Sequence, residues 1–213
     1  HRVNFHYVRS NIEKGRTFMW MFSTQLTEDY IGQSIFYNKS VEVGDKTYNP
    51  LQYSTYENMD GYATLRTHVS YGFPIAPIKC NLNIMAGANW SKTPSMIDGK
   101  ANYTSNMGYD ATVSLGSNIS ENIDFTLQWN GAYNDATQSL AVRNKNNQYF
   151  SHTASGSLKW VFWKGFSITA SANYNQYMGF TDDYNEKFLI CNLYLGKKLF
   201  KNKKMMIILG MVL

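Results

Sequence analysis

The chain has 213 residues, of which 44% are hydrophobic and 15% aromatic, enough for one sizeable domain or for part of a larger one. Mean hydropathy is −0.38, and no stretch approaches the roughly 18–20 consecutive apolar residues of a helical membrane span, which excludes that class. The net charge of +5 is scattered without a basic stripe, which argues against nucleic-acid binding.

The two cysteines bear on metal binding and disulfide formation, and the first residue bears on whether the chain is a fragment. Cys80 and Cys191 lie far apart and form neither a CxxC pair nor a Cys/His cluster, so no metal site is expected. They are interpreted as two isolated small apolar side chains, with a disulfide between them left open. The chain begins at His1 without a charged and apolar leader, which predicts a fragment of a longer protein.

Alternation of apolar and polar residues predicts strands along the whole chain. In chain order, the apolar series that mark these strands cover residues 3–7, 18–26, 61–73, 78–90, 103–115, 123–133, 158–162, 166–174 and 188–196. The tail at residues 205–213 is apolar without alternation, so it is either a final strand cut short or a segment foreign to the fold.

The clearest alternation covers residues 102–134. Leu115 and Leu127 belong to the apolar series, whereas Thr112 and Thr126 belong to the polar one, so the two pairs are expected on opposite faces. Ordinary strands have about 5–6 residues, and these patterns run for about twice that length. Long amphipathic hairpins are typical of a membrane β-barrel, in which every backbone group must pair within the sheet.

The connections alternate between short and long. The order is short at residues 10–16, long at 31–58, short at 74–77, long at 91–100, short at 118–122, long at 135–147, short at 163–165, modestly long at 179–185 and short at 197–204. Outer-membrane barrels show this asymmetry, and a β-sandwich has no reason to keep it. Two aromatic girdles are also expected: Trp20, Phe73, Phe125, Trp160, Phe162 and Phe166 toward the short turns, and Trp90, Tyr103, Tyr133 and Tyr174 toward the long loops.

Four segments carry a resemblance to a known family. They are ENMDGY (57–62), GSNISENIDF (116–125), WVFWKGF (160–166) and NLYLGKKLFKN (192–202). With the predicted hairpins, they resemble the C-terminal barrel of TonB-dependent outer-membrane receptors, of the Bacteroidetes type grouped as the outer-membrane protein β-barrel family. The tail at residues 205–213 departs from the family, which carries a DLLN-like segment there.

The expected fold is all-β: an antiparallel up-and-down meander of about ten long strands, part of a larger transmembrane β-barrel. Residues 1–213 form the C-terminal portion of that barrel, without its plug and N-terminal strands. Because the two ends of the chain do not look able to pair with each other, we expect that residues 1–213 alone do not close into a pore.

The resemblance implies a receptor of the bacterial outer membrane that takes up a solute, with the substrate open between iron chelates, glycans and peptides. Implied partners are the lipid bilayer, the plug and missing strands, TonB through an N-terminal segment, and a surface lipoprotein. No cofactor, nucleic acid or enzymatic activity is expected. The alternatives are a passive porin-like or adhesive barrel, and a soluble secreted β-sandwich that binds a ligand or matrix.

No catalytic, cofactor or metal residue is predicted, and the ligand-binding residues stay unassigned. By strand parity Arg66, His68, Asp110 and Lys159 should point into the lumen, as contacts for a solute or plug or, as favoured here, as a hydrated polar lining. The four histidines are not spaced as metal ligands or as parts of a catalytic group: His1, His6, His68 and His152. The acidic pair Asp182 and Asp183 is expected to be solvated rather than catalytic.

Overall fold

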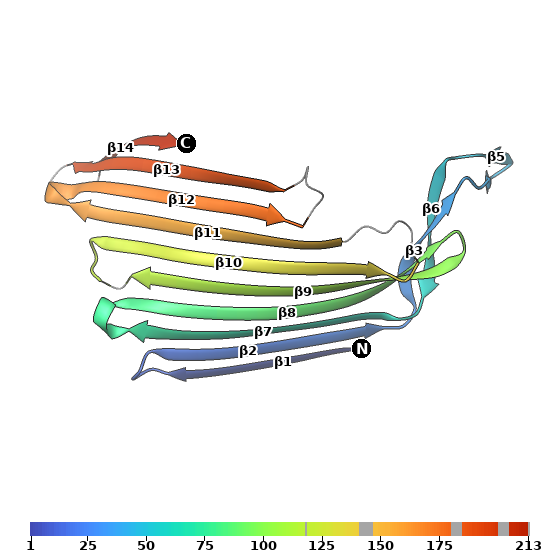
Figure 1. Cartoon of the computed structure of the whole chain (residues 1–213), viewed down its shortest axis with the longest axis horizontal. Helices are drawn as coiled ribbons and strands as arrows, with labels where there is room; N and C mark the ends of the chain where they lie inside the picture. The colour runs from blue at the N-terminus through green and yellow to red at the C-terminus, as the bar shows by residue number, and fades with distance from the viewer. Residues whose placement is uncertain (118, 141–146, 180–184, 200–204, 213) are drawn as a thin grey trace.

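A computed structural model describes residues 1–117, 119–140, 147–179, 185–199 and 205–212. It is all-β, with 83% of the described residues in strands and 3% in short helical turns. Figure 1 shows that the long strands lie side by side in one sheet. The all-β fold class expected from the sequence is therefore confirmed. No helix among the described residues is long and apolar enough to cross a membrane.

Ten strands form an antiparallel meander in which each pairs with the next. They are β1 (Arg2–Asn11), β2 (Arg16–Thr27), β7 (Tyr62–Ile75), β8 (Cys80–Ile97), β9 (Lys100–Ser117), β10 (Ile123–Gln138), β11 (Asn147–Phe162), β12 (Phe166–Met178), β13 (Glu186–Leu199) and β14 (Met205–Val212). Residues 205–212 thus form a last strand on β13.

The register places the apolar series of neighbouring strands opposite one another. One row across the sheet runs through Tyr71, Ile84, Val113, Trp129 and Ala154. The next row, one residue along, lies on the other face and runs through Ser70, Met85, Thr112, Asn130, Thr153 and Asn175. Because successive side chains of a strand alternate in direction, the sheet has one apolar and one polar face.

The sheet has almost no hydrophobic core. Among the described residues, the buried apolar side chains are Ala63 and Cys80. Leu127 and Leu195, on the apolar face, are 52% and 49% exposed. The described residues form no second sheet packed on this one, so the layered core of a β-sandwich is not present in them.

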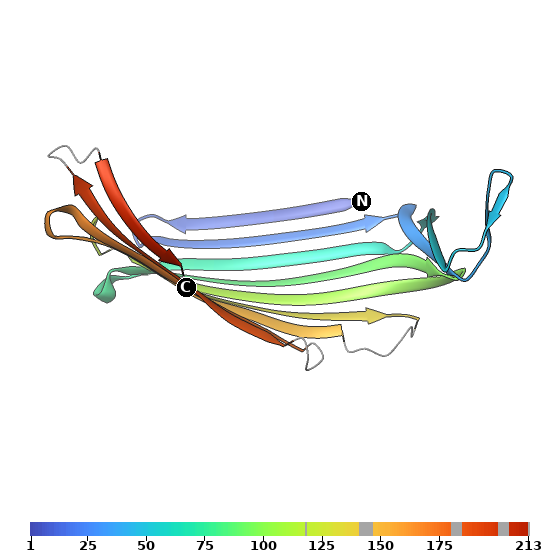
Figure 2. The same ribbon diagram turned by 90° about the horizontal axis from the view of Figure 1, so that it is seen from above.

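The sheet is open. In the described part of the chain β1 and β14 pair with one neighbour each and form its two edges. Seen from above in Figure 2, the sheet curves between these edges without joining them. The expectation that residues 1–213 do not close on themselves agrees with this topology.

The short turns gather where the strands end at the left of Figure 1. This end of the sheet is called the short-turn edge, and it is distinct from the edge strands β1 and β14. Two of the short turns are 3-10 turns, η1 (Ala76–Ile78) and η2 (Trp163–Gly165). Between β1 and β2, Gly15 has φ +59°, a conformation open to glycine without steric cost.

The prediction of a long loop at residues 91–100 is wrong. Strand β8 continues to Ile97 and β9 begins at Lys100, so Asp98 and Gly99 form a two-residue turn with φ of +52° and +80°, as in a type I′ hairpin. Pro94 suggested a loop but lies within β8. Pairing of β8 with β7 ends at Lys92 and parallel pairing with β3 begins at Met96, so Pro94 lies in the gap between these two ladders, where a residue without an N–H is tolerated.

Other expected connections are shorter than predicted. Strand β10 reaches Gln138 and β11 begins at Asn147, within the segment 135–147 expected as a loop. Likewise, β13 runs to Leu199, into the segment expected as a turn at 197–204. The remaining parts of the expected loops, residues 141–146, 180–184 and 200–204, lie outside the described residues.

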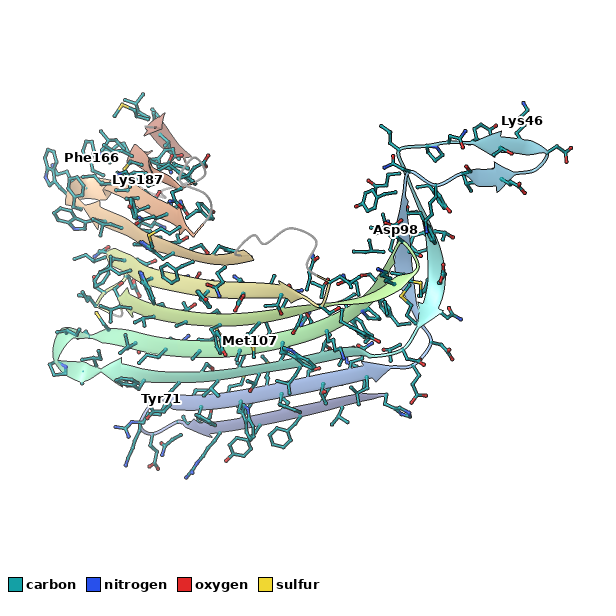
Figure 3. The ribbon with its side chains drawn as sticks, turned by 45° about the vertical axis from the view of Figure 1, so that its right-hand side comes forward. Lys46, Tyr71, Asp98, Met107, Phe166 and Lys187 are labelled. Atoms are coloured by element: carbon teal, nitrogen blue, oxygen red, sulfur yellow. The ribbon has the colours of Figure 1, made fainter. Side chains whose placement is uncertain are left out.

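The segment at residues 31–58 is structured. Strands β3 (Tyr30–Tyr37) and β6 (Gln52–Met59) pair, and between them β4 (Val41–Val43) pairs with β5 (Lys46–Tyr48). In Figure 3 this arm projects beyond the end of the sheet, with Lys46 at its tip. Asp98 holds its base: its N–H donates to Ile35 O at 2.8 Å, and its Oδ1 accepts from Tyr37 N–H at 2.9 Å.

Candidate functional site

The polar face of the meander is the candidate functional site. All four side chains singled out in the sequence lie on this face. Arg66 pairs with Asn89, His68 and Asp110 both pair with Gly87, and Lys159 pairs with Asp124. The structure brings His68 and Asp110 together, with Arg66 two residues from His68 on the same strand. Lys159 is on β11, four strands from β7, and does not join them.

His68 and Asp110 meet across a glycine. His68 on β7 pairs with Gly87 on β8, which pairs with Asp110 on β9. A methyl group at Gly87 would overlap both side chains, and without it His68 Nδ1 lies 4.0 Å from Asp110 Oδ2. The side chains are 35% and 28% exposed, so solvent screens the pair even when the imidazole is protonated.

A second glycine repeats this arrangement two residues further along, in the next row of the same face. Gly108 pairs with Asn89 and with Asn134. A Cβ at Gly108 would lie 2.5 Å from Asn89 Nδ2 and 3.0 Å from Asn134 Oδ1, so both amides lean over this position. Arg66 pairs with Asn89 in register, and its side chain is exposed. Together these residues form a polar patch over two adjacent gaps in the side-chain layer.

Hydroxyl and amide groups bond across the rest of this face. Asn130 Nδ2 donates to Thr112 Oγ1 at 2.8 Å, and Thr153 Oγ1 donates to Asn175 Oδ1 at 2.9 Å. Near one edge Ser23 Oγ donates to Asn4 Oδ1 at 2.8 Å. Such pairs add a modest stabilisation to each strand contact. Amides donate and accept, so the face can bind solutes with either kind of polar group.

The remaining histidines are scattered. His1 donates through its terminal amine to Leu26 O at 2.7 Å, and His6 is an exposed side chain of β1. His152 lies on the apolar face, where its Nε2 is 3.0 Å from Gln176 Oε1. Among the described residues no three His, Cys, Asp or Glu side chains are grouped as metal ligands. Asp182 and Asp183 lie outside the described residues.

The cysteines, for which a disulfide was left open, are both free. Cys80 lies at the start of β8 and Cys191 on β13, so five strand steps of the sheet separate them. Cys80 is buried, and its Sγ donates to Ile78 O at 3.3 Å. Their interpretation as isolated small side chains therefore holds.

Sequence reasoning missed Gly87, Gly108 and Asn134 as parts of the patch. The available signal was a glycine inside each strand pattern, because an interior strand glycine often marks a close approach of other groups. Which side chains approach each glycine depends on the register of three strands, and that is visible only in the folded sheet.

In comparisons with known proteins, no family model matches this chain, and no curated protein is significantly similar to it in sequence.

A double-mutant cycle tests the contact across Gly87. We expect His68→Gln and Asp110→Asn to show a coupling of about 0.5 kcal/mol in the free energy of unfolding at acidic pH, where the imidazole is charged. The coupling should vanish at alkaline pH, and at both pH values when Gly87 is replaced by Ala. Equal coupling at acidic and alkaline pH, or coupling that survives Gly87→Ala, would contradict the ion pair.

Proposed function

We propose that this chain is part of a TonB-dependent-receptor-like barrel of the bacterial outer membrane, which takes up a polar solute. The observation that carries the proposal is the long, single-layer sheet, whose largely apolar face is not covered by any other described residues. An uncovered apolar face of this extent is costly in water, and contact with lipid removes that cost. The four family-like segments favour the receptor type over other barrels.

Strand length supports a membrane location. A transmembrane β-strand needs about 9–11 residues. Nine of the ten meander strands have 10–18 residues, and β14 has 8. Each strand inside the meander also pairs with both neighbours, which satisfies the backbone groups that lipid cannot.

Aromatic residues on the apolar face support the same location. Near the short turns Trp160 and Phe162 contact with ring centroids 4.9 Å apart. Trp20 Nε1 donates to Thr67 Oγ1 at 3.0 Å, and Trp90 Nε1 donates to Ser105 Oγ at 2.9 Å. Tryptophans that expose an apolar ring while their N–H is bonded suit the interface between lipid and water.

The polar face is then the lumen, and the patch of Arg66, His68, Asn89, Asp110 and Asn134 is part of the solute path. Its amides donate and accept hydrogen bonds, which suits solutes rich in hydroxyl or amide groups. Among the three substrate classes, glycans and peptides therefore fit this patch best.

Transport in cells tests the receptor function. Cells that produce the full-length parent protein, of which this chain is proposed to be part, are offered radiolabelled ferric chelates, oligosaccharides and peptides. We expect accumulation of at least one class against its gradient, and loss of that accumulation when a protonophore collapses the energy supply of the inner membrane. Passage that is unchanged by the protonophore would indicate a passive porin-like barrel, and no accumulation of any class would refute uptake.

Substitutions on the two faces test the membrane assignment. Leu115→Arg and Leu127→Arg should each cost about 2–4 kcal/mol of folding free energy if the residue lies near the bilayer midplane. Thr112→Arg and Thr126→Arg, which face the lumen, should cost much less. The measurement is equilibrium refolding, into lipid vesicles, of the full-length parent protein of which this chain is proposed to be part. Equal penalties for the two pairs would show that the faces are wrongly assigned.

A further inference from the structure

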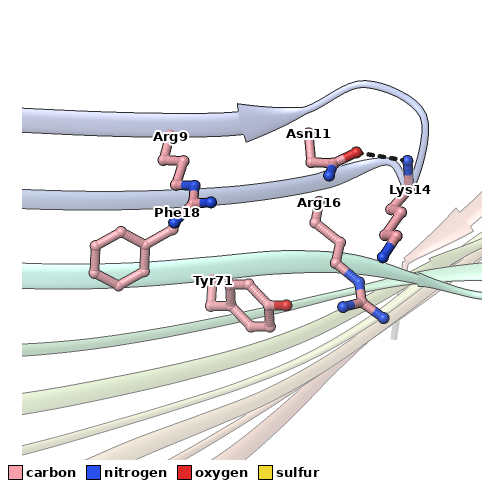
Figure 4. Close-up of a pocket in the computed structure, with 6 residues that line it drawn as sticks. All are labelled: Arg9, Asn11, Lys14, Arg16, Phe18 and Tyr71. Atoms are coloured by element: carbon pink, nitrogen blue, oxygen red, sulfur yellow. Dashed lines mark hydrogen bonds between the residues drawn. The ribbon is translucent and has the colours of Figure 1, made fainter.

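A cationic pocket lies at the turn between β1 and β2, separate from the polar patch. Its volume is about 380 Å³, and it is lined by Arg9, Asn11, Lys14, Arg16, Phe18 and Tyr71. Figure 4 shows the two arginine side chains extending from their strands toward the two aromatic rings. Three cations and two rings thus share one small space at the short-turn edge of the sheet.

The pocket is built by the register of the first three strands. Arg9 pairs with Phe18, which pairs with Tyr71, and Asn11 pairs with Arg16. All five therefore lie on the apolar face, in its last rows before the short turns.

The turn that closes the pocket has a defined shape. Asn11 Oδ1 accepts from Lys14 N–H at 2.9 Å, and Gly15 N–H donates to Ile12 O at 3.2 Å. A Cβ on Gly15 would lie 3.3 Å from Pro74 Cγ, so this turn packs against the end of β7. This turn fixes the backbone positions of Lys14 and Arg16, whose exposed side chains line the pocket.

The charges of the pocket have no anionic partner. Within the described residues, none of Arg9, Lys14 and Arg16 has a carboxylate within 4.0 Å. Glu13 is the one acidic residue in this hairpin tip. The three side chains are exposed, so solvent screens their mutual repulsion, and the space that they line is open to an anion.

The floor of the pocket continues as an aromatic surface. The ring centroids of Phe18 and Tyr7 are 6.1 Å apart, and those of Tyr71 and Phe73 are 5.3 Å apart. Tyr71 is 37% exposed. The pocket therefore has a charged end at the turn and an apolar end on the face of the sheet, which is the polarity of an amphiphile rather than of a free ion.

We propose that this pocket binds an anionic phospholipid, with its phosphate between Arg9, Lys14 and Arg16 and its glycerol and first acyl carbons over Phe18 and Tyr71. Arginine is well suited to phosphate because its planar guanidinium donates two parallel hydrogen bonds. This inference rests on the proposed membrane location, since only there does the apolar face meet lipid.

The same chemistry recurs further along the short-turn edge. Lys197 Nζ lies 3.6 Å from the centroid of the Phe166 ring, and it donates to Lys164 O at 3.0 Å. Lys164 Nζ in turn lies 5.6 Å from the centroid of the Trp163 ring. At this second turn, as at the first, cations lie beside aromatic rings that face outward. This indicates that the short-turn edge lies at the level of the lipid headgroups.

Lipid binding by the charge-neutralised pocket tests the proposal. The full-length parent protein, of which this chain is proposed to be part, is incorporated into nanodiscs that contain dioleoyl-phosphatidylglycerol and dioleoyl-phosphatidylcholine. Native mass spectrometry then measures the lipid that it retains. The variant Arg9→Gln/Lys14→Gln/Arg16→Gln should bind phosphatidylglycerol about tenfold more weakly or worse, because it lacks the charge-assisted hydrogen bonds to phosphate. Its binding of phosphatidylcholine should change less.

A matched control removes three cations elsewhere. Lys46, Lys100 and Lys187 lie on the arm or near the long-connection ends of their strands, and Figure 3 shows Lys46 far from Phe166 on the short-turn edge. The variant Lys46→Gln/Lys100→Gln/Lys187→Gln should retain phosphatidylglycerol like the unmodified protein. Equal loss in both triple variants would show a general charge effect and overturn the site.

Inorganic phosphate separates a lipid site from a phosphate site. If phosphate ion at the same concentration displaces the lipid, the apolar end of the pocket contributes nothing, and the lipid assignment is wrong. Unchanged phosphatidylglycerol binding in the pocket variant, with the protein still inserted in nanodiscs, refutes this inference alone. Failure of the unmodified protein to enter nanodiscs would instead refute the membrane location.

Discussion

The antiparallel register is the constraint on which the rest of the structure depends. Because side chains alternate at every residue, a slip of one position in any strand pair would carry apolar residues to the polar face. Direct pairs such as Leu115 with Leu127 keep the two faces separate from strand to strand. The backbone hydrogen bonds of this ladder, rather than a packed core, hold the meander together, since Ala63 and Cys80 are the buried apolar residues among those described. An environment must therefore stabilise the apolar face from outside.

Glycines give this regular sheet its local features. Over Gly87 and Gly108 polar side chains from both neighbouring strands converge, which creates the patch on the polar face. On the apolar face the Trp129 ring lies over Gly131, 2.6 Å from where a Cβ would be. A glycine thus lets a large or charged neighbour fold down onto the sheet, at the cost of the side-chain contacts that a larger residue would provide. The polar patch and the position of the Trp129 ring on the apolar face have the same physical origin.

Much of the fold could be predicted from alternation alone, because a period of two residues reports directly which face a side chain occupies. The limits of the strands were less predictable. Pro94 suggested a loop, but it lies in the gap between the pairing of β8 with β7 and its pairing with β3, and such a gap cannot be recognised from local sequence. The site shows the same limit: parity placed His68 and Asp110 on the polar face, whereas their contact requires the register of β7, β8 and β9 together.

Residue-by-residue labelling along β9 tests most directly that the apolar face meets lipid and the polar face meets water. In a background without Cys80 and Cys191, single cysteines replace Tyr109, Asp110, Ala111, Thr112, Val113 and Ser114. The full-length parent protein that carries these changes is then reconstituted into lipid vesicles. Reactivity with a water-soluble maleimide should alternate, high at residues 110, 112 and 114 and low at 109, 111 and 113. Uniform reactivity along the strand, or the opposite alternation, would contradict the membrane orientation of the sheet.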